Sequence, residues 1–458
     1  MRKKIDMAFY RRVFSVALPM IIQNGITNFV SLLDNVMVGQ VGTIQMSGVS
    51  IVNQLMFVFN LCVFGAVSGA GIFTAQFHGS GDSKGVRHTF RFKILIGLLL
   101  TAVGVGVFLL GGKSLIRLYL TGDGDVAAAA QTLEYGWKYL LVMLTGLLPF
   151  ALNNAYASTL RETGHTDVPM VAGLIAVAVN FTGNFVLIFG HFGAPKLGVV
   201  GAAVATVLSR YVELAVVAGW THLHGKVCPF IVGAFRSFRI PAELMKKIIV
   251  KGMPLLINEA FWSVGIAMMN QCYSTRGLDV VAAFNIATTI SQLSSVVYLA
   301  LGNAVGILMG QMLGAGLPEA QIRRDNKRMI RLSVGSCLVF GLILVALSGV
   351  FPRIYNTTDQ VRAIATGLIC VTAVIMPVNS YNNVMYFTLR SGGQTFITFL
   401  FDSGFTWVVS VPVAYVLSRF TSLPILPLYA ICMGMDVFKI AVGSYLLNKG
   451  VWIRRIIA

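Results

Sequence analysis

The sequence predicts an all-α polytopic membrane protein with twelve transmembrane helices arranged as two homologous six-helix lobes. Three observations lead to this prediction. Hydrophobic residues make up 56% of the chain and charged residues only 11%, which is too few charges for the surface of a water-soluble globule. Apolar segments of about 20 residues or more, long enough to cross a bilayer as a helix, recur along the chain. The second half of the sequence also repeats the first.

Six spans are expected in the first half, at residues 14–38, 46–76, 93–112, 132–157, 168–190 and 198–221. The second of them is long enough to lie tilted in the bilayer. Pro19 and Pro149 fall inside the first and fourth spans, where proline can kink a helix. Arg210 and Glu213 in the sixth span are opposite in charge and three residues apart, so we expect an ion pair that neutralises both.

Six more spans are expected at residues 252–274, 280–310, 330–350, 361–387, 395–418 and 424–447. Their uninterrupted apolar width favours helices over the alternating pattern of a membrane β-barrel. Pro254, Pro377 and Pro412 lie within three of these spans and are further candidate kinks. Asp436 and Lys439 in the last span have the spacing of a second local ion pair.

An internal repeat organises the chain. One constant offset aligns Pro19 with Pro254, Gly42 with Gly277, Gln76 with Gln311, Gly79 with Gly314 and Gly81 with Gly316. A slightly shorter offset aligns Asn153-Asn154 with Asn382-Asn383, Thr159-Leu160-Arg161 with Thr388-Leu389-Arg390, and Gly164 with Gly393. We expect an N-terminal lobe at residues 1–221, a cytoplasmic linker at 222–251 and a C-terminal lobe at 252–458. Duplicated halves with a central cavity between them are typical of transporters.

The net charge of +18 is explained by membrane topology rather than by nucleic-acid binding, because of where the basic residues lie. With twelve spans both termini lie on one side, and about 25 of the 35 basic residues fall there. They lie in Arg2–Arg12, Lys84–Lys93, Arg161, Lys226–Lys251, Arg323–Arg331, Arg390 and Lys449–Arg455. Because basic loops face the cytoplasm, we expect cytoplasmic termini, a multi-pass protein of the cytoplasmic membrane and no nucleic-acid partner. The first span is too long for the apolar part of a cleavable signal peptide, so we expect it to be retained.

One charged side chain, Asp34, stands alone between Val13 and Gly81. An ionised Asp in hydrocarbon is disfavoured by roughly 2.5 to 3.5 kcal/mol, so intramembrane acids normally face a protein interior and handle an ion, a proton or a substrate. The first span contains no basic residue that could neutralise Asp34. We therefore expect Asp34 to be the coupling site of a transporter.

Four short motifs occur in an order and spacing that are specific when taken together. They are Asp34-Asn35-Val36-Met37-Val38-Gly39, Ala75-Gln76 at the end of the second span, Leu160-Arg161 with Gly164 after the fourth, and Asn180 with Asn184 in the fifth. With these motifs, the twelve spans and the duplication, nearly the whole chain resembles the multidrug and toxic compound extrusion (MATE) family. The resemblance implies a V-shaped bundle of two six-helix lobes around a central cavity, which exports organic cations and other drugs in exchange for Na⁺ or H⁺.

The resemblance maps the family's N-terminal Na⁺ or H⁺ site onto Asp34, Asn180, Asn184, the Ala202 carbonyl and the Thr206 hydroxyl. Asn180 and Asn184 are one helical turn apart, so both amides can offer oxygens to a cation from one helix face. If the ion is Na⁺, Asp34, Asn180 and Asn184 are its expected ligands. One carboxylate suits a monovalent ion but does not choose between Na⁺ and H⁺. Alternatively, the amides only hydrogen-bond a neighbouring helix and Thr206 only bonds its own helix.

Glu259 and Asp402 are the lone charged residues of the seventh and eleventh spans, and each is a candidate for a second protonation or substrate site. Asn258-Glu259-Ala260-Phe261-Trp262 resembles a motif of one bacterial subgroup of the family. Where better known Na⁺-driven members carry acids, this chain has Trp262 and Asn379, which argues against a Na⁺ site in the second lobe. We expect Glu259 to attract cations in the cavity. Asp402 is open to a functional role, a place near a membrane interface or a pairing with a basic residue.

These features predict a secondary antiporter, not an enzyme, that exports amphipathic organic cations as a monomer. The chain has no GxxxxGK[ST] loop, so we expect no cofactor beyond the coupling ion, Na⁺ or H⁺. Aromatic residues of the spans, such as Trp262 and Tyr381, could bind flat cations by stacking and cation–π contact. One alternative is a flippase for a lipid-linked sugar or another lipid-like substrate, which should carry several intramembrane Arg or Lys residues. The other is a membrane-embedded enzyme, which the lack of clustered His, Asp and Glu disfavours.

Overall fold

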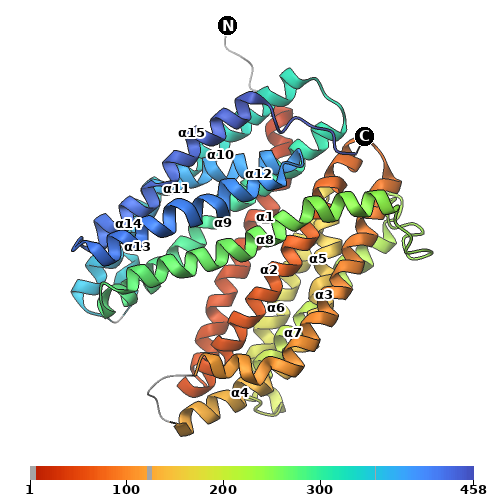
Figure 1. The fold of residues 1–458 in the computed structure, drawn as a ribbon. Helices are drawn as coiled ribbons and strands as arrows, with labels where there is room; N and C mark the ends of the chain where they lie inside the picture. Colours follow the sequence, from red (N-terminus) through yellow and green to blue (C-terminus); the bar gives the residue numbers. More distant parts are fainter. Residues whose placement is uncertain (1–6, 121–125, 356, 458) are drawn as a thin grey trace. The chain divides into compact units, whose positions relative to one another are not determined.

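The computed structural model describes residues 7–120, 126–355 and 357–457, apart from the side chains of Leu32, Asn35, Val36 and Val126. Within these residues every regular element is a helix, and no strand occurs (Figure 1). In the same part of the chain 11 helices are long and apolar enough to cross a membrane, and counting one bent pair as a span gives 12. The predicted all-α polytopic fold is confirmed.

The helices of the first half cover the predicted spans, but the first and third begin earlier, at Met7 and Ser83, and the fourth is broken. They are α1 (Met7–Gly39), α2 (Thr43–Gly79), α3 (Ser83–Leu118), α4 (Val126–Leu144), α5 (Leu147–Glu162), α6 (Asp167–Phe189), the short η1 (His191–Gly193) and α7 (Val199–Leu223). The predicted span 132–157 is the pair α4 and α5, which are bent by 46° at their junction. Pro149 lies in the first turn of α5 and not at the bend, because the first turn needs no N–H donor from it.

The helices of the second half are longer at their predicted cytoplasmic ends than hydropathy indicated. They are α8 (Ala242–Ser274), α9 (Leu278–Gly314), α10 (Glu319–Leu347), η2 (Phe351–Ile354), α11 (Asp359–Ser391), α12 (Thr395–Phe399), η3 (Leu400–Gly404), η4 (Thr406–Ser410), α13 (Val411–Phe420), α14 (Ile425–Gly434) and α15 (Asp436–Lys449). Residues 395–420 form one span in which η3 and η4 have π-helical geometry. Extra residues per turn of this kind often mark functional positions in a helix.

The chain divides by its contacts into two compact units. The N-terminal unit comprises Ile22–Thr74 and Asp82–Ile249. The C-terminal unit comprises Ala75–Gly81, the residues from Val250 onward and the described residues before Ile22. In the first unit α6 packs on α7 and α3 on α5, and in the second α11 packs on α9 and α10. These units are defined by contacts alone, and the lobe boundaries predicted from the sequence stay a prediction.

The repeat is visible in the backbone at matched glycines. Gly81 and Gly316 have φ of +77° and +67°, and Gly164 and Gly393 have φ of +90° and +74°. Residues with a Cβ rarely adopt this left-handed region, so both copies of the repeat need glycine where the chain leaves a helix. The same loop geometry has thus been kept in both halves.

The last turn of α2 belongs to the C-terminal unit because it packs against the matched turn of α9. A Cβ on Gly79 would collide with the carbonyl oxygen of Gln311, and a Cβ on Gly314 with that of Gln76. The Gln76 side chain donates from Nε2 to the carbonyls of Ser391 and Arg454, at 3.0 and 3.1 Å. The contact between the two turns is therefore reciprocal, as expected for equivalent positions of a repeat.

The segment between α7 and α8 is fixed to the N-terminal unit. Helices extend into both ends of the predicted linker 222–251, so its non-helical part spans 224–241. The Arg91 guanidinium on α3 donates to the carbonyls of Ala234, Gly233 and Arg239, at 2.7, 2.9 and 3.2 Å. These bonds satisfy backbone groups that have no helical partner, so the segment is docked rather than loose.

Candidate functional site

Asp34 near the end of α1 is held by an amide from α6. Asn184 Nδ2 donates to Asp34 Oδ1 at 2.7 Å, and Asn184 is only 1% exposed. No described Lys or Arg forms an ion pair with Asp34. The acid predicted to have no basic partner is therefore bound by a neutral amide, and no described basic residue balances its charge.

Asn180 lies one turn before Asn184 and reaches the same carboxylate. With its amide nitrogen turned toward Asp34, it donates to Oδ2 at 2.7 Å and to Oδ1 at 3.1 Å. In this orientation the Asn180 oxygen also accepts from the Thr206 hydroxyl at 3.2 Å. The opposite orientation brings the amide oxygen against the carboxylate, which requires a proton on Asp34 or a cation between the two oxygens. The amide can thus follow the charge state of Asp34.

Thr206 and Ala202 on α7 complete the cluster. The Thr206 hydroxyl donates to the Ala202 carbonyl at 2.9 Å, the local bond that intramembrane Thr commonly makes. The same hydroxyl lies 3.2 Å from the Asn180 amide. All five predicted residues, from three helices, are consequently joined by hydrogen bonds.

Small residues allow α6 and α7 to approach closely enough for this contact. A Cβ on Gly183 would come within 2.8 Å of the Ala205 Cβ, and one on Gly201 within 2.6 Å of the Leu187 carbonyl oxygen. Such small-residue interfaces are the usual means of close helix packing in membranes. The glycines thereby set the spacing between the asparagines of α6 and Thr206 of α7.

The cluster offers more acceptors than its own donors can satisfy. Asn184 Oδ1 is buried and accepts no hydrogen bond from any described residue. A carboxylate, amide oxygens, a hydroxyl and a main-chain carbonyl are oxygen ligands of the kind that hard cations take in proteins. The same carboxylate can bind a proton instead. The geometry therefore fits either Na⁺ or H⁺.

The expected ion pair between Arg210 and Glu213 is wrong, since none forms between these two described residues. Arg210 Nη1 instead donates to the Gly146 carbonyl at 3.3 Å, and its guanidinium lies 5.0 Å from the centre of the Phe150 ring. The junction of α4 and α5 supplies this carbonyl, and hydropathy gave no sign of the junction. The expected pair of Asp436 and Lys439 is confirmed, at 3.1 Å.

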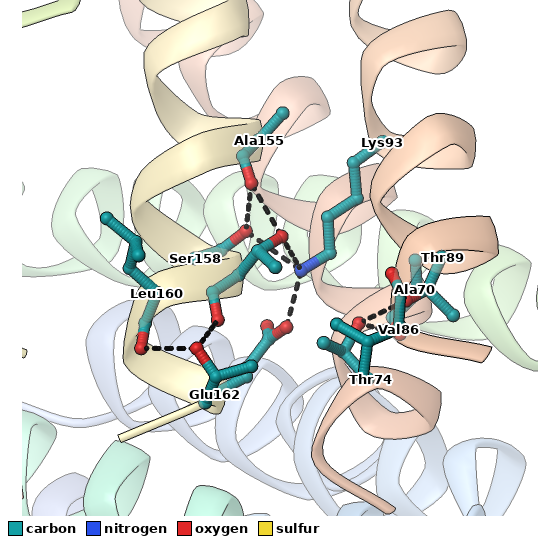
Figure 2. Close-up of polar contacts among 11 residues, drawn as sticks. Ala70, Thr74, Val86, Thr89, Lys93, Ala155, Ser158, Leu160 and Glu162 are labelled. Carbon is teal, nitrogen blue, oxygen red and sulfur yellow. Dashed lines mark hydrogen bonds and ion pairs between the residues drawn. The ribbon is translucent and has the colours of Figure 1, made fainter. Parts of the chain in front are cut away.

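A buried ion pair that the sequence analysis missed joins α3 to α5 (Figure 2). Lys93 is fully buried, and its Nζ lies 2.5 Å from Glu162 Oε2, 3.0 Å from Ser158 Oγ and 3.2 Å from Thr159 Oγ1. Lys93 is among the basic residues predicted to lie on the cytoplasmic side, but its burial and its partner were not predicted. One signal was available, because Lys93 and Glu162 both lie at span ends predicted to be on the same side.

The predicted second-lobe residues lie in the C-terminal unit but do not form one cluster of direct contacts. Asp402 accepts from Asn258 Nδ2 at 3.0 Å, and Glu259, the next residue along α8, is half-buried. The Tyr381 hydroxyl is hydrogen-bonded to Ser444 at 2.8 Å. Trp262 on α8 is 38% exposed, and Asn379 on α11 is half-buried. Asp402 is therefore the second acid with a defined polar environment.

Comparisons with known proteins agree with this architecture. The MatE family model matches residues 19–186 and 254–416, which together make up most of both halves. The chain is 24% identical over 456 residues to the probable multidrug resistance protein NorM of Thermotoga maritima, covering 97% of this chain and 93% of that protein. It is 25% identical over 434 residues to the probable multidrug resistance protein YoeA of Bacillus subtilis, covering 93% and 90%.

A solved structure shares the fold. The crystal structure of MATE in complex with MaL6 superposes with a TM-score of 0.85 at 20% identity, and the match covers 96% of each chain. The family model extends through both copies of the repeat, and the motifs that carried the resemblance, Asp34 and Leu160-Arg161 among them, fall within its matched range. The chain therefore belongs to the MatE family and is a multi-pass membrane transporter, not an enzyme.

Proposed function

We propose that this protein is a secondary antiporter that exports amphipathic organic cations across the cytoplasmic membrane in exchange for Na⁺ or H⁺. The observation that carries the proposal is the buried cluster around Asp34, in which a lone carboxylate is held by neutral amides. An intramembrane acid without a basic partner is the usual device for coupling to a cation. The names of the relatives, which are probable multidrug resistance proteins, support drug export as the process.

The coupling mechanism follows from the hydrogen bonds of Asp34. When the carboxylate is ionised, both amides donate to it and tie α1 to α6. Binding of a proton converts one oxygen to a donor, and binding of Na⁺ turns amide oxygens toward the ion. Either event changes which position of α1 the cluster favours. A bound ion or proton shifts a conformational equilibrium only when it binds one conformation more tightly than the other. We propose that this reseating of α1 releases the drug outward.

The expected topology completes the proposal. Cytoplasmic termini follow from the excess of basic residues on that side, and a monomer with its own duplicated halves is sufficient for transport. The bilayer and a drug-like cation are then the only partners required.

The test is efflux of ethidium from proteoliposomes under an imposed Na⁺ gradient or an imposed H⁺ gradient, measured separately. We expect one gradient to drive efflux and Asp34→Asn to abolish it. Asp359→Asn, at a fully exposed acid on α11, is the matched control and should keep wild-type rates. If neither gradient moves ethidium and Asp34→Asn behaves as wild type, the proposal fails and transport of a lipid-linked substrate becomes the next function to test.

A further inference from the structure

A second polar site lies where the eleventh span becomes π-helical. Asp402 belongs to η3, and the following residue is fastened to α8. The Ser403 hydroxyl donates to Asn258 Oδ1 at 2.7 Å, and the Ser403 N–H donates to the same oxygen at 3.3 Å. Asn258 is 2% exposed and Ser403 is fully buried, so these bonds are sheltered from solvent. The π-helical turn is thereby held in place and fixes the direction of Asp402.

Among the described residues, a hydrogen-bond donor reaches only one oxygen of Asp402. Asn258 Nδ2 donates to Oδ2 at 3.0 Å and also reaches the Tyr386 hydroxyl at 3.4 Å. The other oxygen, Oδ1, faces the Lys439 ammonium at 3.8 Å, which is an ion pair but too long for a hydrogen bond. A quarter of the Asp402 side chain is exposed. The carboxylate is therefore oriented but has unused capacity.

Lys439 on α15 supplies the positive charge beside Asp402. Its Nζ lies 3.1 Å from Asp436 Oδ1 and 5.1 Å from the centre of the Phe405 ring. Lys439 is 8% exposed, and two carboxylates thus share one ammonium. An aromatic face beside acidic groups is the arrangement that binds organic ammonium and phosphonium ions. When both carboxylates are ionised, Asp402, Asp436 and Lys439 together carry a net charge of −1.

An independent observation indicates a further acceptor beside Asp436. Asn382 on α11 donates from Nδ2 to the Asp436 carbonyl at 2.9 Å, and Asn382 is 9% exposed. Its Oδ1 is buried and accepts no hydrogen bond from the described residues. An unused acceptor in the same region is what a site for a cation, rather than a closed structural ion pair, should contain.

We propose that Asp402, Asp436 and the Phe405 ring form a binding site for a monovalent organic cation, for which Lys439 is a built-in competitor. When a lipophilic cation enters, the Lys439 ammonium moves off Asp402 and keeps its shorter bond to Asp436. The inference rests on the proposed function, because it names residues through which the C-terminal unit selects cationic substrates. By occupying the site when no substrate is present, Lys439 lowers the affinity of the site for an organic cation. Its positive charge also helps to expel the cation afterwards.

The test is equilibrium binding of tetraphenylphosphonium to the purified full-length protein in detergent, at one pH and without any ion gradient. Lys439→Met removes the competitor at similar length and should tighten binding by about tenfold or more. Lys439→Arg keeps the charge and should bind as wild type. Adding Asp402→Asn to Lys439→Met should remove the gain, because the acid that holds the cation is lost.

Two further variants test the proposal if Lys439→Met does not purify as a monodisperse protein. Asp436→Asn leaves the ammonium to Asp402 alone and should weaken binding. Phe405→Leu removes the aromatic face and should also weaken it. Wild-type affinity in a folded Lys439→Met protein, or a gain that survives Asp402→Asn, would overturn the inference.

The same measurements separate this inference from the proposed function. Gradient-driven efflux that depends on Asp34, with no effect of Lys439→Met on binding, refutes only the second site. Tighter binding by Lys439→Met without efflux under either gradient refutes only the antiport.

Discussion

Asn184 has two separate roles at Asp34, one for each end of its amide. Nδ2 orients the carboxylate at 2.7 Å, and Oδ1 is a buried acceptor with no donor among the described residues. The unused oxygen supports the proposed coupling role of the cluster, because it leaves a buried acceptor that a cation beside Asp34 can use.

Asn184→Leu should reduce gradient-driven ethidium efflux by about tenfold or more, because Asp34 loses its donor and the ion loses an acceptor. The measurement is the initial efflux rate in proteoliposomes with equal amounts of protein. Asn303→Leu is the matched control, since the Asn303 amide donates to the Leu299 carbonyl of its own helix. Equal rates for the two variants would contradict a role of Asn184 in coupling.

Lys93→Met should lower the thermal stability of the protein strongly. The change leaves the buried Glu162 carboxylate without its ammonium, and breaking a buried ion pair in this way costs about 3–5 kcal/mol. The midpoint of thermal unfolding in detergent measures the effect. The double variant Lys93→Met with Glu162→Gln removes both charges and should recover most of the loss. A double variant no more stable than Lys93→Met would argue against the pair as the cause.

The family resemblance grouped Asp34 with Asn180 and Asn184, and the structure brings these residues together, but contacts for which no such guide existed were missed. Asp34 could be found because a lone acid in an apolar segment is costly whatever surrounds it. The pairing of Lys93 with Glu162 and the turn of Arg210 toward Gly146 depend on which helices are neighbours. A single sequence without its fold does not carry that information.

At the scale of helices, apolar length predicted where spans occur but not how they are broken. The junction of α4 and α5 has no proline, and its 46° bend comes from two turn residues. The π-helical turns η3 and η4 were likewise invisible, because hydropathy is the same for α- and π-helical geometry. The number and order of the spans depend on composition, whereas the breaks depend on packing.

Gly183→Val should impair transport through the spacing of α6 and α7. The added side chain meets Ala205 and separates Asn180 from Thr206, so the Asp34 cluster is disrupted. We expect a large loss of efflux, measured in proteoliposomes beside the unfolding midpoint. Gly219→Val on α7 is the control, since a Cβ there has no atom within 4 Å. Similar losses for both variants would show that bulk alone is responsible.

For the whole molecule, duplication could be read from the sequence because loop glycines and interface residues recur at a fixed distance. The matched positive φ values and the reciprocal contact of Gly79 with Gln311 and Gly314 with Gln76 give that repeat a physical reason. The assignment of Ala75–Gly81 to the C-terminal unit was not predictable. This assignment depends on contacts with the end of the chain, and no apolar periodicity in that segment predicts those contacts.

Gln76→Leu should destabilise the C-terminal unit by about 2–4 kcal/mol, from the loss of three hydrogen bonds to main-chain groups. Besides its two donations, Gln76 accepts from the Ile456 N–H at 2.9 Å. The unfolding midpoint in detergent is the measurement. Gln40→Leu, at an exposed position after α1, should leave it unchanged. Removal of the residues after Gly450 should cost more than Gln76→Leu, because it removes two hydrogen-bond partners of Gln76 and also the buried Trp452.

The reciprocal contact at the ends of α2 and α9 joins the two halves of the polypeptide without using the segment that connects them. Gly79 and Gln76 come from the first half of the sequence, yet they are packed against residues of the second. Covalent continuity through residues 224–241 is therefore not the sole tie between the halves. We therefore expect two fragments of the chain separated within residues 224–241 to associate through this contact when they are expressed together.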